Sequence, residues 1–281
     1  MTIPEKLKDL VDRMPNPDQR GMLTTDVDKE KIERAVAAIH DGGREYVVAL
    51  IGMLVPPGQG DDAKAHYALH CLANHVLKIR DENARRQFAE TLAAQLGDRP
   101  KGVQAFLCQE LQWAGRSEAC AALGKLLTDE DLSAPAAMAL VAIRDGAAEQ
   151  FRAALPAARG KCRLQVVQGL GAAGDKQSAG ALREALNDPD REVRLAAGWG
   201  LGRMGDASSV DTLLKAADVE PGWERIQATK HCLVLAEKLL AAGKKTEARR
   251  VLAHLRDTRT DPGEAYVRQA AEKALAGTPI P

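Results

Sequence analysis

The chain of 281 residues has few aromatic side chains, which make up 3% of it, and no excess of either charge. Lys and Arg together number 39, as do Asp and Glu, so the long-range field that draws proteins to nucleic acid or anionic membranes is missing on average. The sequence contains no run of 18 apolar residues, and its start, MTIPEKLKDLVDRM, lacks the apolar core of a signal peptide. We therefore expect a soluble, cytoplasmic protein with no membrane partner; the alternative is an exported protein whose signal has been removed.

Signatures of catalysis are also missing. The stretch PPGQGDD lacks the Lys-Ser/Thr end of a phosphate-binding P-loop, and no serine lies in a nucleophile-elbow sequence. The cysteines have no C-x-x-C spacing and fall inside expected helices, which is typical of small core side chains and not of a metal site or a disulfide framework. They are Cys71, Cys108, Cys120, Cys162 and Cys232. These absences favour a protein that has no cofactor and is not an enzyme, although they leave the enzyme question open.

The sequence does contain a repeated amphipathic helix. Residues 161–174, KCRLQVVQGLGAAG, are echoed 31 residues later by residues 192–205, EVRLAAGWGLGRMG. Apolar residues recur in each copy with the spacing i, i+4, i+8 and i+11, which is one face of an α-helix. The same face is found in four successive helices: Val103, Leu107, Leu111 and Ala114; Leu132, Ala136, Leu140 and Ile143; Cys162, Val166, Leu170 and Ala173; and Val193, Ala197, Leu201 and Met204.

A shorter second helix is expected after each of these first helices. The turns between them are Gly115-Arg116, Asp145-Gly146, Gly174-Asp175 and Gly205-Asp206. In such turns Gly supplies the left-handed residue that ends one helix, and Asp can cap the next. Successive units are separated at Asp188-Pro189-Asp190, where Pro stops a helix. A helix pair of about 30 residues that cannot bury its apolar face alone, and that repeats along the chain, predicts an all-α solenoid.

A family resemblance is carried by the residues DPDREVRLAAGWGLGRMGD, followed by VDTLLKA. They resemble the bacterial-type HEAT repeat, and the match is best over residues 160–217. The resemblance implies a HEAT-like, right-handed α-solenoid of about seven to eight antiparallel helix pairs. We expect one continuous solenoid domain, in which residues 1–60 form a divergent N-terminal helical cap and residues 61–281 form the HEAT-like helical repeats.

The regions on either side of the best match depart from it in helix length. Longer pairs are expected at residues 28–41 with 43–54 and at residues 61–80 with 83–97. Near the C-terminus one long helix is expected over residues 222–242, paired with residues 244–256. The inner face of the long helix is predicted at Ile226, Thr229, Leu233, Ala236 and Leu240.

Residues that break the repeat are the candidates for specific binding. Trp199 stands where the preceding copy has Gln168, and it either packs against an adjacent unit or forms an exposed anchor. Trp223 is a second aromatic candidate. Three basic residues on one flank of their helix, Lys245, Arg249 and Arg256, are candidate contacts for an anionic group. The alternative for these three is an ordinary solvated helix flank.

Five charged residues are expected to have a structural role. Arg163, Arg194 and Arg268 occupy equivalent positions in their helices, and Asp175 and Asp206 occupy equivalent turns. The resemblance to HEAT proteins implies that they belong to the Asp/Arg ladder, which ties successive units together through hydrogen-bonded charges.

His66 and His70 stand four residues apart on the 61–80 helix, a spacing that allows two imidazoles to bind one metal. No carboxylate lies at the zinc-protease spacing, so we predict no metal site and keep these histidines only as candidates. HEAT-like deoxyhypusine hydroxylases bind two irons through His-Glu pairs, and here no His is followed by Glu. HEAT-like phycocyanobilin lyases share only the repeat with this chain, and HEAT-like DNA glycosylases need a basic face that the balanced charge disfavours.

The leading hypothesis is therefore a non-enzymatic scaffold whose concave surface, lined by the second helices, binds an unidentified protein or peptide partner. The alternative is a HEAT-like enzyme or ligand-binding protein, related to metals or tetrapyrroles. A nucleic-acid partner is less favoured than either.

Overall fold

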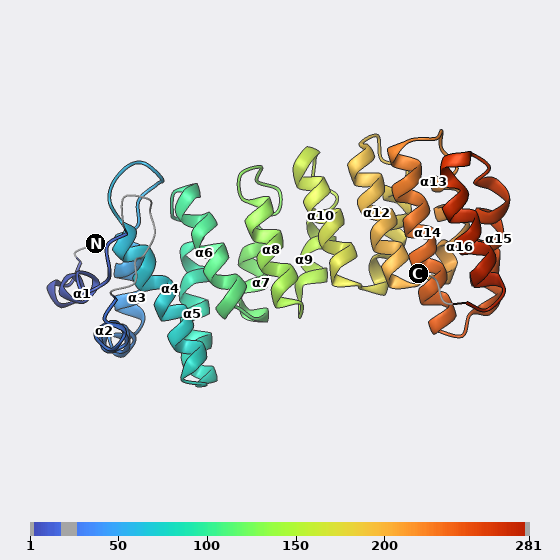
Figure 1. The fold of residues 1–281 in the computed structure, drawn as a ribbon. Helices are drawn as coiled ribbons and strands as arrows, with labels where there is room; N and C mark the ends of the chain where they lie inside the picture. Colours follow the sequence, from blue (N-terminus) through green and yellow to red (C-terminus); the bar gives the residue numbers. More distant parts are fainter. Residues whose placement is uncertain (1–2, 18–26, 279–281) are drawn as a thin grey trace. The chain divides into compact units, whose positions relative to one another are not determined.

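The computed structural model describes residues 3–17 and 27–278, and all regular structure in these ranges is helical (Figure 1). It comprises sixteen α-helices and three short 3-10 helices, with no strand among the residues described. The chain divides into two compact units, Met1–Gln150 and Phe151–Pro281. The all-α prediction is confirmed, whereas one continuous domain with a cap over residues 1–60 stays a prediction. Within the described ranges no helix is both long and apolar enough to cross a membrane.

Unit 1 contains four first helices, which pack side by side in the order α2, α4, α6 and α8, and second helices that pack in the order α3, α5 and α7. Helix α1 packs against α2 and α4. The bounds are α1 (Glu5–Val11), α2 (Lys29–Asp41), α3 (Gly43–Ile51), α4 (Ala63–Lys78), α5 (Glu82–Gln95), α6 (Lys101–Ala114), α7 (Ser117–Gly124), α8 (Ser133–Ile143) and α9 (Ala147–Ala154), within which the division between the units falls.

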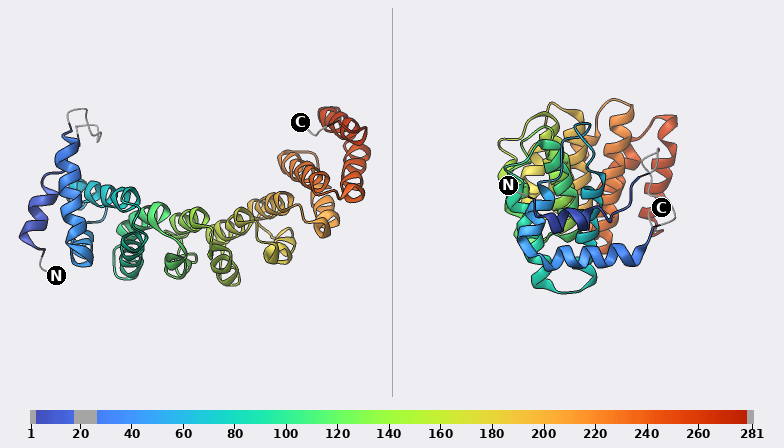
Figure 2. Two further views of the ribbon diagram at one scale, coloured as in Figure 1. Left: turned by 90° about the horizontal axis from the view of Figure 1, so that it is seen from below. Right: turned by 90° about the vertical axis from the view of Figure 1, so that its left-hand side faces the viewer.

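Unit 2 continues the alternation. Its first helices α10, α12 and α14 pack in that order, the second helices α13 and α15 pack together, and α16 packs against α15. In the right-hand view of Figure 2 the helices drawn in orange and red stand side by side. The bounds are α10 (Gly160–Ala173), η1 (Lys176–Ser178), α11 (Ala179–Ala185), α12 (Arg191–Met204), η2 (Ala207–Ser209), α13 (Val210–Ala217), α14 (Trp223–Ala241), α15 (Lys245–Thr258), η3 (Pro262–Glu264) and α16 (Ala265–Leu275).

The turns of unit 2 follow the predicted chemistry. Gly174 and Gly205 end α10 and α12 with φ of 64°, the left-handed region that favours glycine. The Asp190 carboxylate caps α12 by accepting a hydrogen bond from the Glu192 backbone N–H at 2.8 Å. In unit 1 the prediction for Gly115 is wrong. Its φ is −72°, so α6 ends in extended backbone and not in a left-handed residue.

The core lies along the predicted faces of the first helices. All the predicted positions of α6 and α8 are buried, and in α10 and α12 only the last of each set, Ala173 and Met204, is half-buried. The prediction for α14 is confirmed at Thr229 and Ala236, which are buried, and wrong at Ile226, which is exposed; Leu233 and Leu240 are half-buried. The buried residues of this helix are Ala228, Thr229, Cys232, Leu235, Ala236 and Leu239. Helix α14 packs against α12, α13 and α15, so it buries a wider face than one apolar stripe indicates.

Candidate functional site

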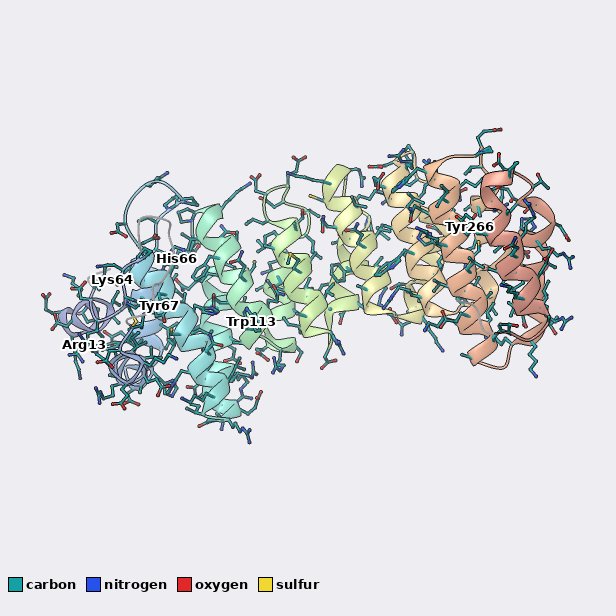
Figure 3. The ribbon with its side chains drawn as sticks, viewed as in Figure 1. Arg13, Lys64, His66, Tyr67, Trp113 and Tyr266 are labelled. Atoms are coloured by element: carbon teal, nitrogen blue, oxygen red, sulfur yellow. The ribbon has the colours of Figure 1, made fainter. Side chains whose placement is uncertain are left out.

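Every large hydrophobic side chain that is exposed among the described residues belongs to a first helix, to its C-cap, or to α16. The second helices expose none. The set is Ile79 at the C-cap of α4, Trp113 on α6, Met138 and Val141 on α8, Trp199 on α12, Trp223 and Ile226 on α14, and Tyr266 on α16. Figure 3 labels two of them, Trp113 in unit 1 and Tyr266 in unit 2. In each unit these exposed apolar side chains therefore lie on the outward face of the first helices, which is the side turned to solvent.

In unit 1 this surface centres on α6 and α8. Trp113 and Met138 are each 59% exposed, and Val141 is exposed on the turn after Met138. Helix α8 contains no charged residue, and α6 contains only Lys101 and Glu110. Lys101 pairs with acidic residues beside the start of α8, whereas Glu110 is buried. This part of the surface is therefore apolar and uncharged, so covering it requires little desolvation of charge.

In unit 2 the tryptophans predicted as binding residues each lie beneath an arginine. The Arg203 guanidinium lies 5.0 Å from the centre of the Trp199 ring, and the Arg191 guanidinium lies at the same distance from the Trp223 ring. Trp199 also lies against α10, where a Cβ built on Gly171 would meet its ring at 3.0 Å. Trp199 thus packs against the preceding helix pair of unit 2 and remains partly exposed, combining the two alternatives.

The predicted basic residues of α15 differ in their partners. Arg256 donates a hydrogen bond from Nε to the Asp257 carboxylate at 2.7 Å, which offsets its charge. Lys245 and Arg249 are exposed, and their side chains make no hydrogen bond or ion pair with any residue that the structure describes. Only these two remain available as contacts for an anionic group.

The predicted ladder residues do not pair with one another. Arg163 Nε lies 2.5 Å from Asp188 Oδ2, and Arg194 Nη2 lies 2.7 Å from Glu224 Oε1. Each of these acidic residues comes later in the chain, at the boundary with the next helix pair. Arg268 instead donates to the backbone oxygen of Asp261 at 3.0 Å.

The two turn aspartates are bound from the other side, by arginines of the preceding second helices. Asp175 accepts from Arg152, and Asp206 accepts from Arg183 at 2.7 Å. These arginines were missed from the sequence, although their separation of 31 residues is that of the repeat. Each such pair connects a second helix to the turn of the following helix pair by charge-assisted hydrogen bonds.

The two candidate histidines of α4 lie beside carboxylates. His70 Nδ1 is 3.1 Å from Glu110 Oε1, and the Glu110 side chain is only 3% exposed. His66 Nδ1 is 3.2 Å from Asp62 Oδ2, and its ring centre is 4.3 Å from that of Phe106. Figure 3 shows His66 on α4.

Burial raises the pKa of Glu110, and the adjacent His70 and His66 lower it in part. Asp62 stands four residues before His66, so local spacing could have revealed it, but Glu110 comes from another helix and gives no local signal. No three His, Cys, Asp or Glu side chains within the described ranges are grouped to hold a metal ion together.

A groove of about 690 Å³ lies between α2 and α4 in unit 1. Apolar side chains line it, including Val36, Ala37 and Ile79, and an ion pair between Glu33 and Lys78 with an N–O distance of 2.9 Å lies at its edge. His75 also lines the groove, and burial lowers its pKa, as do the neighbouring His40 and Lys78 to a smaller extent. The volume is within the range of small-molecule pockets.

Comparison with known proteins identifies the repeat. Residues 148–234 match the family model of HEAT repeats. The chain contains HEAT repeats in this segment. Its fold is an all-α, HEAT-like solenoid, as the sequence predicts. No curated protein matches this chain in sequence.

The solved structures that are similar to this chain include the following three. An engineered protein is 20% identical, with 97% of this chain and 82% of that chain covered and a TM-score of 0.38. The complex of CpcE and CpcF of phycocyanin lyase from Nostoc sp. PCC7120 is 17% identical, with 88% and 92% covered and a TM-score of 0.37. A designed armadillo repeat protein in complex with the peptide (KR)4 is 21% identical, with 97% and 100% covered and a TM-score of 0.32.

Proposed function

We propose that this HEAT-repeat protein is a non-enzymatic scaffold that binds a protein or peptide partner along the outward face of its first helices. The observation that carries the proposal is the distribution of exposed large hydrophobic side chains, all of which lie on the first helices, their caps or α16. Exposed apolar surface with aromatic and Met residues is typical of binding surfaces, and Trp is enriched among the residues that dominate binding energy.

The mechanism is geometric. Neighbouring helices of one unit hold side chains such as Trp113 and Met138 on a preformed surface, so few backbone dihedrals have to be ordered on binding. Tryptophan adds a large contact area at the cost of only two side-chain torsions. The partner gains contacts from several helices at once, which is the way in which repeat proteins bind.

The second helices are the alternative binding face, as predicted from the sequence. Their candidate contacts are Lys245 and Arg249 of α15, whose side chains have no ion-pair partner among the described residues. This alternative favours an acidic partner, whereas the first helices favour an apolar one.

Affinity capture with the immobilised full chain separates the two faces. We expect Trp113→Ser with Met138→Ser to reduce capture of the specific partner by more than about tenfold, because truncation of a binding hot spot costs about 2 kcal/mol or more. The matched control, Lys245→Glu with Arg249→Glu, should leave capture unchanged. Both pairs are exposed, so melting temperatures should stay close to that of the unmodified chain.

Two results would count against this assignment. Loss of capture only in the α15 control would move the binding face to the second helices. Failure of the unmodified chain to retain any partner above the level of a denatured control would contradict the scaffold function itself.

A further inference from the structure

The histidines of α4 share an unusual arrangement. His66 and His70 are four residues apart on one helix, so their side chains lie on the same face, about one turn from each other. In each ring Nδ1 lies beside a carboxylate, at 3.2 Å from Asp62 Oδ2 for His66 and at 3.1 Å from Glu110 Oε1 for His70. Two helices therefore contribute to a pair of carboxylate–imidazole contacts that no binding surface described above requires.

The contacts define which nitrogen of each ring carries the proton. His66 Nδ1 faces two acceptors, the Asp62 carboxylate and the Asp62 backbone oxygen at 3.3 Å, so Nδ1 must donate. At His70 the Asn74 side-chain amide nitrogen, a donor, lies 3.1 Å from Nε2, so Nε2 accepts and Nδ1 donates to Glu110. In both neutral rings the lone pair is consequently on Nε2.

This is the arrangement that proteins use to orient metal ligands. A metal-binding histidine generally donates its other ring N–H to a carboxylate or carbonyl, which fixes the tautomer and increases the basicity of the ligating nitrogen. Here the fixation is strengthened by burial of Glu110 and by the Phe106 ring against His66.

We propose that His66 and His70 form a binding site for a divalent transition metal, with both Nε2 atoms as ligands and with Asp62 and Glu110 as positioning residues. Imidazole pairs suit Zn²⁺, Ni²⁺ and Cu²⁺, whereas Mg²⁺ and Ca²⁺ prefer oxygen ligands. Two protein ligands leave the remaining coordination positions to water or to a group from a bound molecule. The ion is therefore exchangeable, and it binds more weakly than at a structural site with a full set of protein ligands.

The test is calorimetric titration of the untagged full chain with Zn²⁺, Ni²⁺ or Cu²⁺ in a buffer that does not chelate metals. We expect one ion per chain, with Cu²⁺ bound most tightly. His66→Ala and His70→Ala should each weaken binding at least tenfold, because either change removes half of the ligands. Glu110→Gln should weaken it by about tenfold, as is found for outer-sphere partners of ligating histidines.

Asn74→Ala gives a prediction of opposite sign. It removes the amide that competes for His70 Nε2, so metal affinity should rise, by roughly fivefold for one hydrogen bond. A purely structural role of the cluster would not produce tighter binding in this variant.

His40 and His75 provide the matched control. Their rings also meet, with centres 5.2 Å apart, but they lie on α2 and α4 in another part of unit 1. Binding should persist in His40→Ala with His75→Ala. The proposal is overturned if this control abolishes binding, if His66→Ala or His70→Ala leaves it unchanged, or if no ion binds at millimolar concentration. The two half-exposed histidines can be replaced without touching the core, and circular dichroism of each variant checks the fold.

Discussion

The first helices of the two units are spaced by different means. In unit 2 their backbones approach directly: a Cβ on Gly171 would lie 2.9 Å from the Gly200 Cα, and one on Gly202 would lie 2.6 Å from the His231 backbone oxygen. In unit 1 the first helices α2, α4 and α8 contain no glycine, and between α2 and α4 a groove of about 690 Å³ remains. Glycine-mediated backbone contact among α10, α12 and α14 thus contrasts with the side-chain-lined groove between α2 and α4.

The difference separates residues that support the fold from residues that are free for binding. A glycine inside a helix costs about 1 kcal/mol relative to Ala. In α10 and α12 the close backbone contacts that glycine permits explain its presence. Unit 1 has room for polar side chains between its first helices, and there the buried Glu110 meets His70. The candidate metal site and the groove both occur where the glycine-mediated contact is missing.

The largest effect should come from closing the backbone contact in unit 2. Gly202→Leu would place side-chain atoms against the His231 backbone oxygen, which cannot move as a side chain can. We expect a loss of about 3 kcal/mol in the free energy of unfolding, at the upper end for overpacked cores. Urea unfolding followed by circular dichroism measures this loss.

Gly180→Ala is the matched control for that substitution. Gly180 lies in α11, and a Cβ there meets only the Arg183 guanidinium, at 4.0 Å. The change should stabilise unit 2 by roughly 0.5–1 kcal/mol through helix propensity. Equal effects of the two substitutions would contradict the idea that glycine sets the spacing of the helices.

The second prediction concerns the loss of stability at acidic pH. Burial lowers the pKa of His231 to about 4 from the ordinary value of 6.5. Between these pH values the unfolded chain binds a proton that the folded chain does not, so stability is full above pH 6.5 and falls as the pH is lowered towards 4. The loss is at most about 3 kcal/mol, at about 1.4 kcal/mol for each pKa unit.

Urea unfolding at pH 7 and at pH 4.5 should show this loss in the unmodified chain and a smaller one in His231→Gln. His75→Gln serves as the comparison in unit 1, where burial also lowers the pKa but the ring lies in an open groove. If His75→Gln changed the pH dependence of stability as much as His231→Gln, the packing around the two histidines would not determine how strongly each one affects stability in acid.

The sequence predicts the fold where one apolar stripe determines which face is buried. The spacing of Val193, Ala197 and Leu201 was enough, because α12 buries these residues as its central stripe. In α14 two stripes are apolar, and packing against three neighbouring helices decides between them. Spacing alone could not supply that choice, so the prediction failed at Ile226 although Thr229 and Ala236 are buried as predicted.

The candidate site was predictable only in part. The interval between His66 and His70 is visible along the chain, as is Asp62 one turn earlier. Glu110 is forty residues from His70 and occupies no position that the repeat marks, so its contact depends on the packing of α4 against α6. The exposure of Met138 was not predicted, because the repeat pattern identifies only the buried positions of this helix.

The third prediction compares ion pairs at similar places in the two units. Arg163 Nε lies 2.5 Å from Asp188 Oδ2, and the Asp188 side chain is 6% exposed. A double-mutant cycle with Arg163→Met and Asp188→Asn should give a coupling of about 1 kcal/mol. In unit 1 the exposed Lys101 and Asp131 form the counterpart, with an N–O distance of 2.7 Å.

The Lys101 pair should show a weaker coupling that disappears in molar salt, because solvent screens exposed charges. The Arg163 pair should retain most of its coupling under the same conditions. If the coupling energy of the Lys101 pair did not change with salt, the ion pairs of the two units would not differ in how strongly solvent screens them.

The smallest effect is expected from filling the groove of unit 1. Ala37 lines the space between α2 and α4, so a larger side chain there can extend over apolar neighbours without displacing backbone. Ala37→Leu should stabilise the chain slightly, by up to about 1 kcal/mol, because it buries additional methyl and methylene groups.

Ala35→Leu on the same helix is the matched control: Ala35 is fully buried, and the larger side chain should destabilise the fold. Both values come from urea unfolding. If Ala37→Leu destabilised the chain as much as Ala35→Leu, the groove would already be closed in solution, and the contrast in packing between the two units would not hold there.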